Sequence, residues 1–222
     1  MKWFGLVVTL LLLTVAYRGW AASSRRRFLA AFRLPGSVLQ RMQQKHPELT
    51  ESQQRLVQQG LQQYFRVCVA ARGRFVSMPS QVVDDLWHEF ILFTRLYQNF
   101  CQRAFGRYLH HTPVEVMPTP TTASDGIRRA WRLACREEGI NPARPERLPL
   151  LFALDAQLGI AGGFVYALNC KATAVSSSGS FCASDIGCGG SRGGSSDSSG
   201  DAGGDGGDGG SSCGGGCGGG GD

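Results

Sequence analysis

An apolar stripe in the middle of the chain constrains the fold more than any other feature. Large apolar side chains recur there at alternating steps of three and four residues, which places them on one face of an α-helix. The members of the stripe are Val83, Leu86, Phe90, Phe93, Tyr97, Phe100 and Ala104, with Trp87 and Ile91 on its edge. Pro79 suits the first turn of such a helix and Gly106 suits its end. The pattern predicts one long core helix over residues 78–104.

The polar side chains of the same segment carry the groups best suited to chemistry. At about 100° per residue, the face opposite the stripe holds Asp84, Asp85, His88, Arg95 and Asn99. Each aspartate lies three or four residues before His88, so either carboxylate can meet the imidazole. Two further histidines follow the predicted helix end, and only a chain reversal brings them back. The candidate functional cluster is Asp84, Asp85, Trp87, His88, His110 and His111, with His88 and His110 as candidate ligands of a divalent transition metal.

These residues also carry a family resemblance. The run Asp85, Leu86, Trp87, His88, followed by Tyr97, Cys101 and a histidine beyond a short glycine-containing segment, resembles the uncharacterised glycine-rich domain-containing proteins of bacteria and plants. The resemblance covers roughly residues 35–113, and a glycine-rich tail adds to it. Phe90 stands where plant members often have a second histidine, which weakens any metal site carried over from them. The resemblance implies a related fold and supplies no known activity.

The N-terminus predicts a membrane segment. Residues 3–17 contain no charge and follow Lys2, but this run is shorter than the roughly 20 residues of a bilayer span. A cleaved signal peptide is therefore the alternative to an anchor over residues 1–20. Arg18 directly follows the run and Trp20 disfavours a cleavage site ending at Ala22, which favours the anchor. Flanking arginines outweigh Lys2, so the body is expected in the cytoplasm; after cleavage it would be secreted or periplasmic.

A basic segment over residues 21–34 follows the apolar run. It combines several arginines with Phe28, Leu29 and Phe32. Two interpretations are open: a stop-transfer flank, which is favoured, or an amphipathic helix lying along an anionic membrane surface.

Further helical patterns surround the central stripe. Residues 35–113 are expected to form the helical core, in which a short helix ends before Pro47 and residues 50–53 form a capping box. Residues 114–173 are expected to pack on that core, with a helix from Asp125 to about Glu138, a short core helix over residues 149–158 and either a short strand or an extended arm over residues 164–168. The expected fold class is all-α: a small helical bundle with an N-terminal membrane anchor and a disordered glycine-rich tail.

The predicted tail, residues 174–222, differs from the rest in composition. It holds 20 of the 31 glycines, and its six aspartates and one arginine give −5, leaving +11 on the remaining chain. So little apolar surface cannot offset the entropy of ordering, which predicts disorder. Cys213 and Cys217 are spaced so that they could share a metal or form a disulfide, but glycine runs specify neither.

Three functions compete on these grounds. The first is a membrane-anchored helical module that binds a protein partner or acts as a scaffold. The second is a metal-binding or acid–base enzyme that uses Asp85, His88 and His110. The third is binding of anionic lipid or nucleic acid by the basic body, and nucleic acid is disfavoured because the aromatic side chains are assigned to the core.

Overall fold

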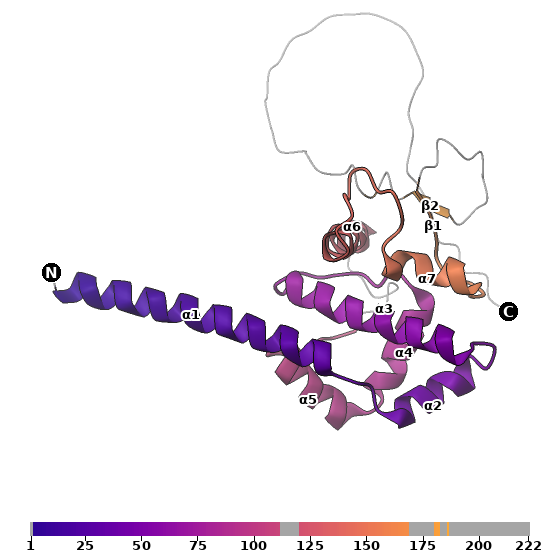
Figure 1. The fold of residues 1–222 in the computed structure, drawn as a ribbon, viewed down its shortest axis with the longest axis horizontal. Coiled ribbons are helices and arrows are strands. Elements are labelled where there is room, and N and C mark those ends of the chain that lie inside the picture. Colours follow the sequence, from indigo (N-terminus) through magenta and orange to yellow (C-terminus); the bar gives the residue numbers. More distant parts are fainter. Residues whose placement is uncertain (1, 112–119, 169–179, 183–185, 187–222) are drawn as a thin grey trace, which may run out of the picture. The chain divides into compact units, whose positions relative to one another are not determined.

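The protein is described by a computed structural model that covers residues 2–111, 120–168, 180–182 and 186 (Figure 1). This part of the chain folds into seven helices and one pair of short strands, which confirms the all-α fold class. Cys213 and Cys217 lie outside the described residues. The structured part continues beyond residue 174, because Ser180–Cys182 forms a strand and Ile186 packs against the core.

The first helix, α1 (Lys2–Ala31), is continuous through both the apolar run and the arginines. Its segment Leu6–Ala31 is long and apolar enough to cross a membrane, a test that a signal sequence also passes. The apolar side chains of the basic segment enter the bundle, while the role of its arginines at a membrane stays a prediction. Leu29 is buried, and the rings of Phe28 and Phe32 pack on Phe100.

Two helices follow α1. Helix α2 (Gly36–Lys45) ends before Pro47 as predicted, and α3 (Glu51–Ala70) begins with the predicted capping box. Thr50 accepts a hydrogen bond from the Gln53 backbone, and the Gln53 side chain accepts one from the Thr50 backbone. Helix α3 packs on α4, α6 and α7, so it forms the centre of the bundle.

The central stripe forms two helices rather than the single helix predicted. Helix α4 (Gln81–Ile91) ends at Leu92, and α5 (Thr94–Phe105) begins after Phe93, whose backbone angles are not helical. The backbone N–H of Phe93 still bonds the Phe90 carbonyl, and the Phe93 carbonyl accepts from Tyr97, so few hydrogen bonds are lost at the break. Figure 1 shows the two helices running in different directions. The predicted stripe is nevertheless buried on both sides of the break, with Phe93 partly buried.

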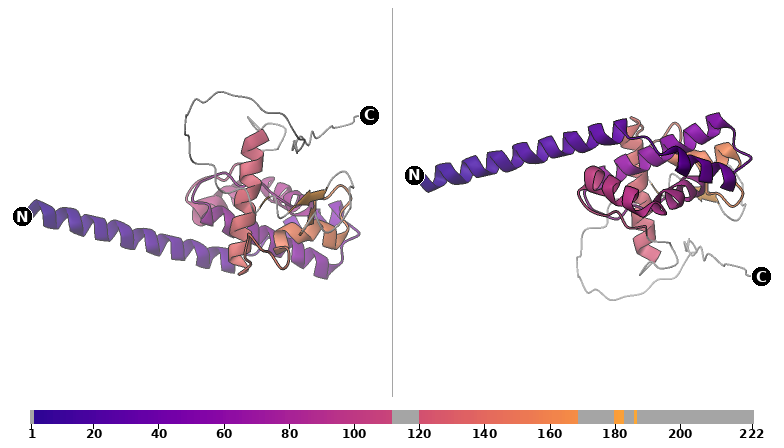
Figure 2. Two further views of the ribbon diagram at one scale, coloured as in Figure 1. Left: turned by 90° about the horizontal axis from the view of Figure 1, so that it is seen from above. Right: turned by 90° about the horizontal axis from the view of Figure 1, so that it is seen from below.

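The second half of the bundle covers α3. Helix α6 (Pro120–Glu137) begins before the predicted start at Asp125, and its buried side chains include Ala130, Trp131 and Ala134. It is seen end-on in Figure 1 and along its length in Figure 2, so it crosses α3. The short core helix appears as α7 (Leu150–Leu158), and the predicted strand as β1 (Val165–Ala167), which pairs in parallel with β2 (Ser180–Cys182).

A buried carboxylate fixes the start of α4. Asp155 on α7 is 2% exposed and accepts hydrogen bonds from the Ser80 hydroxyl at 2.7 Å and from the backbone N–H groups of Gln81 and Val82. It also accepts from the Phe164 backbone at 2.9 Å. The first N–H groups of a helix have no partner within the helix, so a carboxylate there satisfies them and favours the positive end of the helix dipole. The N-terminal turn of α4, which carries Asp84, is thereby held to α7.

Candidate metal centre

The candidate site begins on the exposed side of α4. Asp84 and His88 are four residues apart, and His88 Nδ1 lies 3.5 Å from Asp84 Oδ2. Asp84 belongs to the first turn, where the helix dipole favours a negative charge. The predicted meeting of a carboxylate with His88 is therefore made by Asp84.

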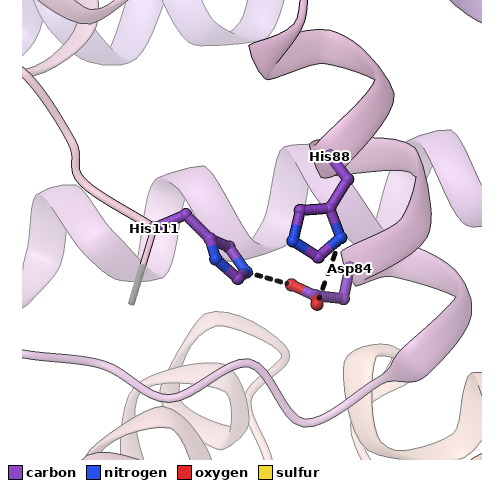
Figure 3. A group of neighbouring side chains, drawn as sticks. All are labelled: Asp84, His88 and His111. Atoms are coloured by element: carbon purple, nitrogen blue, oxygen red, sulfur yellow. Dashed lines mark hydrogen bonds and ion pairs between the residues drawn. The ribbon is translucent and has the colours of Figure 1, made fainter. Parts of the chain in front are cut away.

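A third group comes from the segment that follows α5. Gly106 ends α5 in the left-handed conformation, with φ 71°, and the chain then runs back along α4. His111 Nε2 lies 2.8 Å from Asp84 Oδ1, and the rings of His88 and His111 are 4.2 Å apart between centroids. Figure 3 shows both imidazoles turned toward the Asp84 carboxylate. One ligand atom from each of these residues lies within 4.8 Å of the others.

Side chains on α4 and α5 hold the segment that carries His111. The Tyr97 hydroxyl donates a hydrogen bond to the Leu109 carbonyl at 2.6 Å and accepts one from Trp87 Nε1 at 3.1 Å. The Trp87 indole packs edge-on against the His111 ring at 4.7 Å. Burial raises the pKa of Tyr97, so its hydroxyl stays protonated and remains a donor. Trp87 and Tyr97 thus form the wall behind the imidazole.

The site is buried on one side and open on the other. The side chains of Asp84 and His111 are 19% and 14% exposed, whereas that of His88 is 45% exposed. A group bound between the three residues would therefore have a path to solvent on the His88 side.

Asp85 faces away from this group, which differs from the predicted placement. It is buried against α2, where its carboxylate accepts hydrogen bonds from Lys45 at 2.7 Å and pairs with His46 Nε2 at 2.9 Å. Burial by itself raises the pKa of Asp85, but the hydrogen bonds from Lys45 and His46 outweigh burial and lower that pKa. Asp85 accordingly links α4 to the C-terminal end of α2. Sequence reasoning missed Lys45 and His46 because they lie about 40 residues from Asp85 and share no spacing with it.

His110 also lies apart from the site. Its side chain is exposed and its ring packs on Tyr108 at 4.8 Å between centroids. His88 and His110 were the candidate metal ligands, but the structure places the neighbouring imidazole, His111, beside His88 instead. The reason is the hydrogen bond at Leu109, which sets the direction of the residues that follow.

Two histidine nitrogens and a carboxylate oxygen are a familiar ligand set for metals. Zinc in catalytic sites and non-haem iron(II) both use such a set and leave positions open for water or substrate. With metal–nitrogen bonds of about 2.0–2.1 Å, tetrahedral ligand atoms lie about 3.4 Å apart. His111 Nε2 lies 2.8 Å from Asp84 Oδ1, His88 Nδ1 lies 3.5 Å from Asp84 Oδ2, and one ligand atom of each residue lies within 4.8 Å of the others. The donor set suits a divalent transition metal.

Residues 24–186 match the UCP032817-like family, which is most of the chain. The chain belongs to that family. No match was found among the curated proteins or among the solved structures. The segment matched to the UCP032817-like family begins after the apolar part of α1 and ends at Ile186, which packs against the core. It includes the whole candidate site.

Proposed function

We propose that this member of the UCP032817-like family is a membrane-anchored protein whose helical domain binds one divalent transition metal ion through Asp84, His88 and His111. The single observation that carries the proposal is the convergence of these three donors within 4.8 Å. Two of them come from one helix turn, and the third is brought there by a chain reversal that Tyr97 and Trp87 hold.

The second imidazole supports a metal over a plain ion pair of one histidine with Asp84. The two imidazole rings lie 4.2 Å apart beside a single carboxylate, and an ion pair with Asp84 would need only one of them. A divalent ion takes two neutral imidazoles and the carboxylate together, so all three groups act as ligands.

The arrangement indicates a centre that could act on a ligand. Three protein ligands leave at least one coordination position, and the exposed side of His88 gives that position access to solvent. A metal ion held there would supply Lewis acidity or an activated water. Asp84 would hold the ion, and the wall made by Trp87 and Tyr97 would orient His111, as the outer partners of metal ligands do elsewhere.

The membrane location rests on α1. The side chains described from residue 3 to residue 20 are exposed, and several are large and apolar, which suits a lipid environment better than water. Arg25, Arg26 and Arg27 follow this stretch and favour a cytoplasmic body. A C-terminal reporter that is active only outside the cytoplasm would overturn this orientation, and an N-terminus found at residue 22 or 23 in the mature protein would overturn the anchor.

A cobalt(II) titration of the full chain tests the metal site. Cobalt(II) bound by imidazole and carboxylate gives visible absorption, and the free ion in water gives little. We expect saturation at one ion per chain for the wild type and for His46→Ala and His110→Ala, which change histidines outside the site. His88→Ala and His111→Ala should lose the absorption. Equal titration curves for all four variants would contradict the proposal.

An interaction module is the second candidate, and one observation favours it. Leu92 and Leu96 are 60% and 37% exposed and flank the break between α4 and α5. Burial of exposed apolar side chains against another protein is favourable because it removes apolar surface from water. Sedimentation of the wild type and of Leu92→Gln at rising concentration tests self-association. If both proteins sediment as monomers at every concentration, the exposed leucines do not support an interaction module.

A further inference from the structure

A second feature lies at the junction between α1 and the body. Arg103 on α5 places its guanidinium over the ring of Phe28 on α1, with the central carbon 4.4 Å from the ring centroid. Arg25 on α1 lies against Gly106, at the C-terminal end of α5. Two arginines from different helices therefore lie at the junction where α1 packs on α5.

Two more arginines adjoin this pair. The guanidinium of Arg107 lies over Gly73, with Nη2 3.7 Å from where a Cβ would stand. Gly73 belongs to the turn between α3 and α4, next to Arg74. We call Arg25, Arg74, Arg103 and Arg107 the arginine cluster. Arg129 borders Arg74: burial lowers the pKa of Arg129, the positive charge of Arg74 lowers it further, and the carboxylate of Asp125 acts in the opposite direction.

No carboxylate in the part of the chain that the structure describes forms an ion pair with an arginine of the cluster. The carboxylates there that pair with arginine have other partners: Arg41, Arg55, Arg66, Arg128 and Arg147. Like charges gathered without carboxylates repel one another, so the arrangement favours an external anion. Arg74, Arg103 and Arg107 are exposed and can reach one.

The geometry of α1 sets the level of the cluster relative to a bilayer. A hydrocarbon core of about 30 Å takes roughly 20 helical residues, so a span that begins at Trp3 ends near Ala22. Arg18 then lies about one turn from its end, from where a long side chain reaches the headgroups. Arg25 follows three residues after Ala22, at about 5 Å along the helix axis. That is the depth of the lipid headgroups. Arg103 and Arg107 come to the same level because α5 packs on the end of α1.

We propose that the arginine cluster binds the phosphate groups of anionic phospholipids and so holds the body against the membrane that α1 crosses. The proposal rests on the membrane anchoring proposed above. It concerns residues separate from the metal site. Guanidinium groups form paired hydrogen bonds with phosphate, and a cytoplasmic leaflet supplies anionic headgroups at this level.

Nucleic acid fits this surface less well. Single strands need exposed aromatic rings on which bases stack. Two rings at the cluster cannot stack on bases, because Arg103 covers Phe28 and Phe100 is buried.

The test uses the full chain in a neutral detergent with fluorescently labelled phosphatidylglycerol, followed by anisotropy, and labelled phosphatidylcholine as the neutral lipid. The double variant Arg103→Gln/Arg107→Gln should bind phosphatidylglycerol at least tenfold more weakly than the wild type. Arg136→Gln/Arg144→Gln makes the same change of charge at exposed arginines outside the cluster and should stay within twofold. Arg74→Gln/Arg107→Gln repeats the test without disturbing the contact of Arg103 with Phe28.

Each remaining outcome overturns the proposal. Equal losses in the cluster variants and the control variant would show a response to net charge alone. If the wild type bound phosphatidylglycerol and phosphatidylcholine equally well, the arginine cluster would not be a site for anionic lipid. Loss of oligonucleotide binding with unchanged lipid binding would assign the cluster to nucleic acid. The measurement requires neither insertion of α1 into a bilayer nor a bound metal ion. A negative result would therefore contradict lipid binding by the arginine cluster without contradicting the metal site or the anchor.

Discussion

Tyr97 donates a hydrogen bond of 2.6 Å from its hydroxyl to the carbonyl of Leu109, and this bond places His111 beside Asp84. The same hydroxyl accepts from Trp87, so α4, α5 and the returning segment meet at one oxygen atom. An imidazole on a loop is a precise ligand only where such contacts fix the loop.

The first prediction removes that hydroxyl. Tyr97→Phe leaves the indole N–H of Trp87 without its partner and releases Leu109, so His111 loses its fixed position. We expect cobalt(II) affinity to fall about 10–100-fold, as for other outer partners of metal ligands. Tyr108→Phe is the matched control, because the Tyr108 ring packs on Tyr97 and no hydrogen bond of its hydroxyl occurs among the described residues. Equal affinities in the two variants would show that Tyr97 does not position the site.

The second prediction concerns Trp87, which is 3% exposed and packs on Tyr64 and Phe65. Trp87→Ala should lower the free energy of unfolding by about 3–5 kcal/mol, because it leaves a large cavity in the core. Urea titration followed by circular dichroism measures this. A loss below about 1 kcal/mol would contradict the assignment of Trp87 to the core. Trp87→Phe keeps an aromatic ring in the core and removes the N–H together with a smaller volume than Trp87→Ala does, so it should cost less stability than Trp87→Ala.

The third prediction tests the carboxylate at the start of α4. Asp155→Asn keeps the size of the side chain but removes the negative charge and one acceptor oxygen, so the backbone N–H of either Gln81 or Val82 loses its partner. We expect a loss of about 3 kcal/mol in the free energy of unfolding. Asp125→Asn, an exposed aspartate on α6, should change it by less than about 0.5 kcal/mol. Similar small effects in both variants would show that Asp155 does not stabilise the start of α4.

The fourth prediction uses pH. The lowered pKa of Asp85 means that its charged form stabilises the fold at every pH above the ordinary aspartate value of about 3.9. That stabilisation is lost as the pH falls through the lowered pKa of the folded state. Asp85→Asn should therefore unfold more easily than the wild type by about 1–3 kcal/mol at neutral pH. The difference should shrink below about pH 4. A difference that stays constant from neutral pH to acid would contradict the pairing with Lys45 and His46.

Periodicity in the sequence was sufficient for the helices and for most of the core. The capping box of α3, the end of α5 at Gly106 and the inner face of α6 all appear where local patterns place them. The break at Leu92 could not be predicted in this way. The apolar spacing continues through it unchanged, and Phe93 stays partly buried after leaving the helical conformation.

The candidate site was less predictable because its members are set by long-range contacts. Asp85 was assigned to the solvated side of the helix, but α2 covers that side, so the carboxylate is buried. His110 and His111 are adjacent in sequence, and no local signal distinguishes them. The hydrogen bond from Tyr97 to Leu109 decides which imidazole faces Asp84.

The metal content of the purified full chain is the most direct test of the central claim. After loading with zinc(II) and removal of free ion, elemental analysis should give one metal ion per wild-type chain and one per His110→Ala chain. His111→Ala, which changes the very next residue, should retain none. Metal absent from the wild type, or retained equally by both variants, would contradict a metal centre at Asp84, His88 and His111.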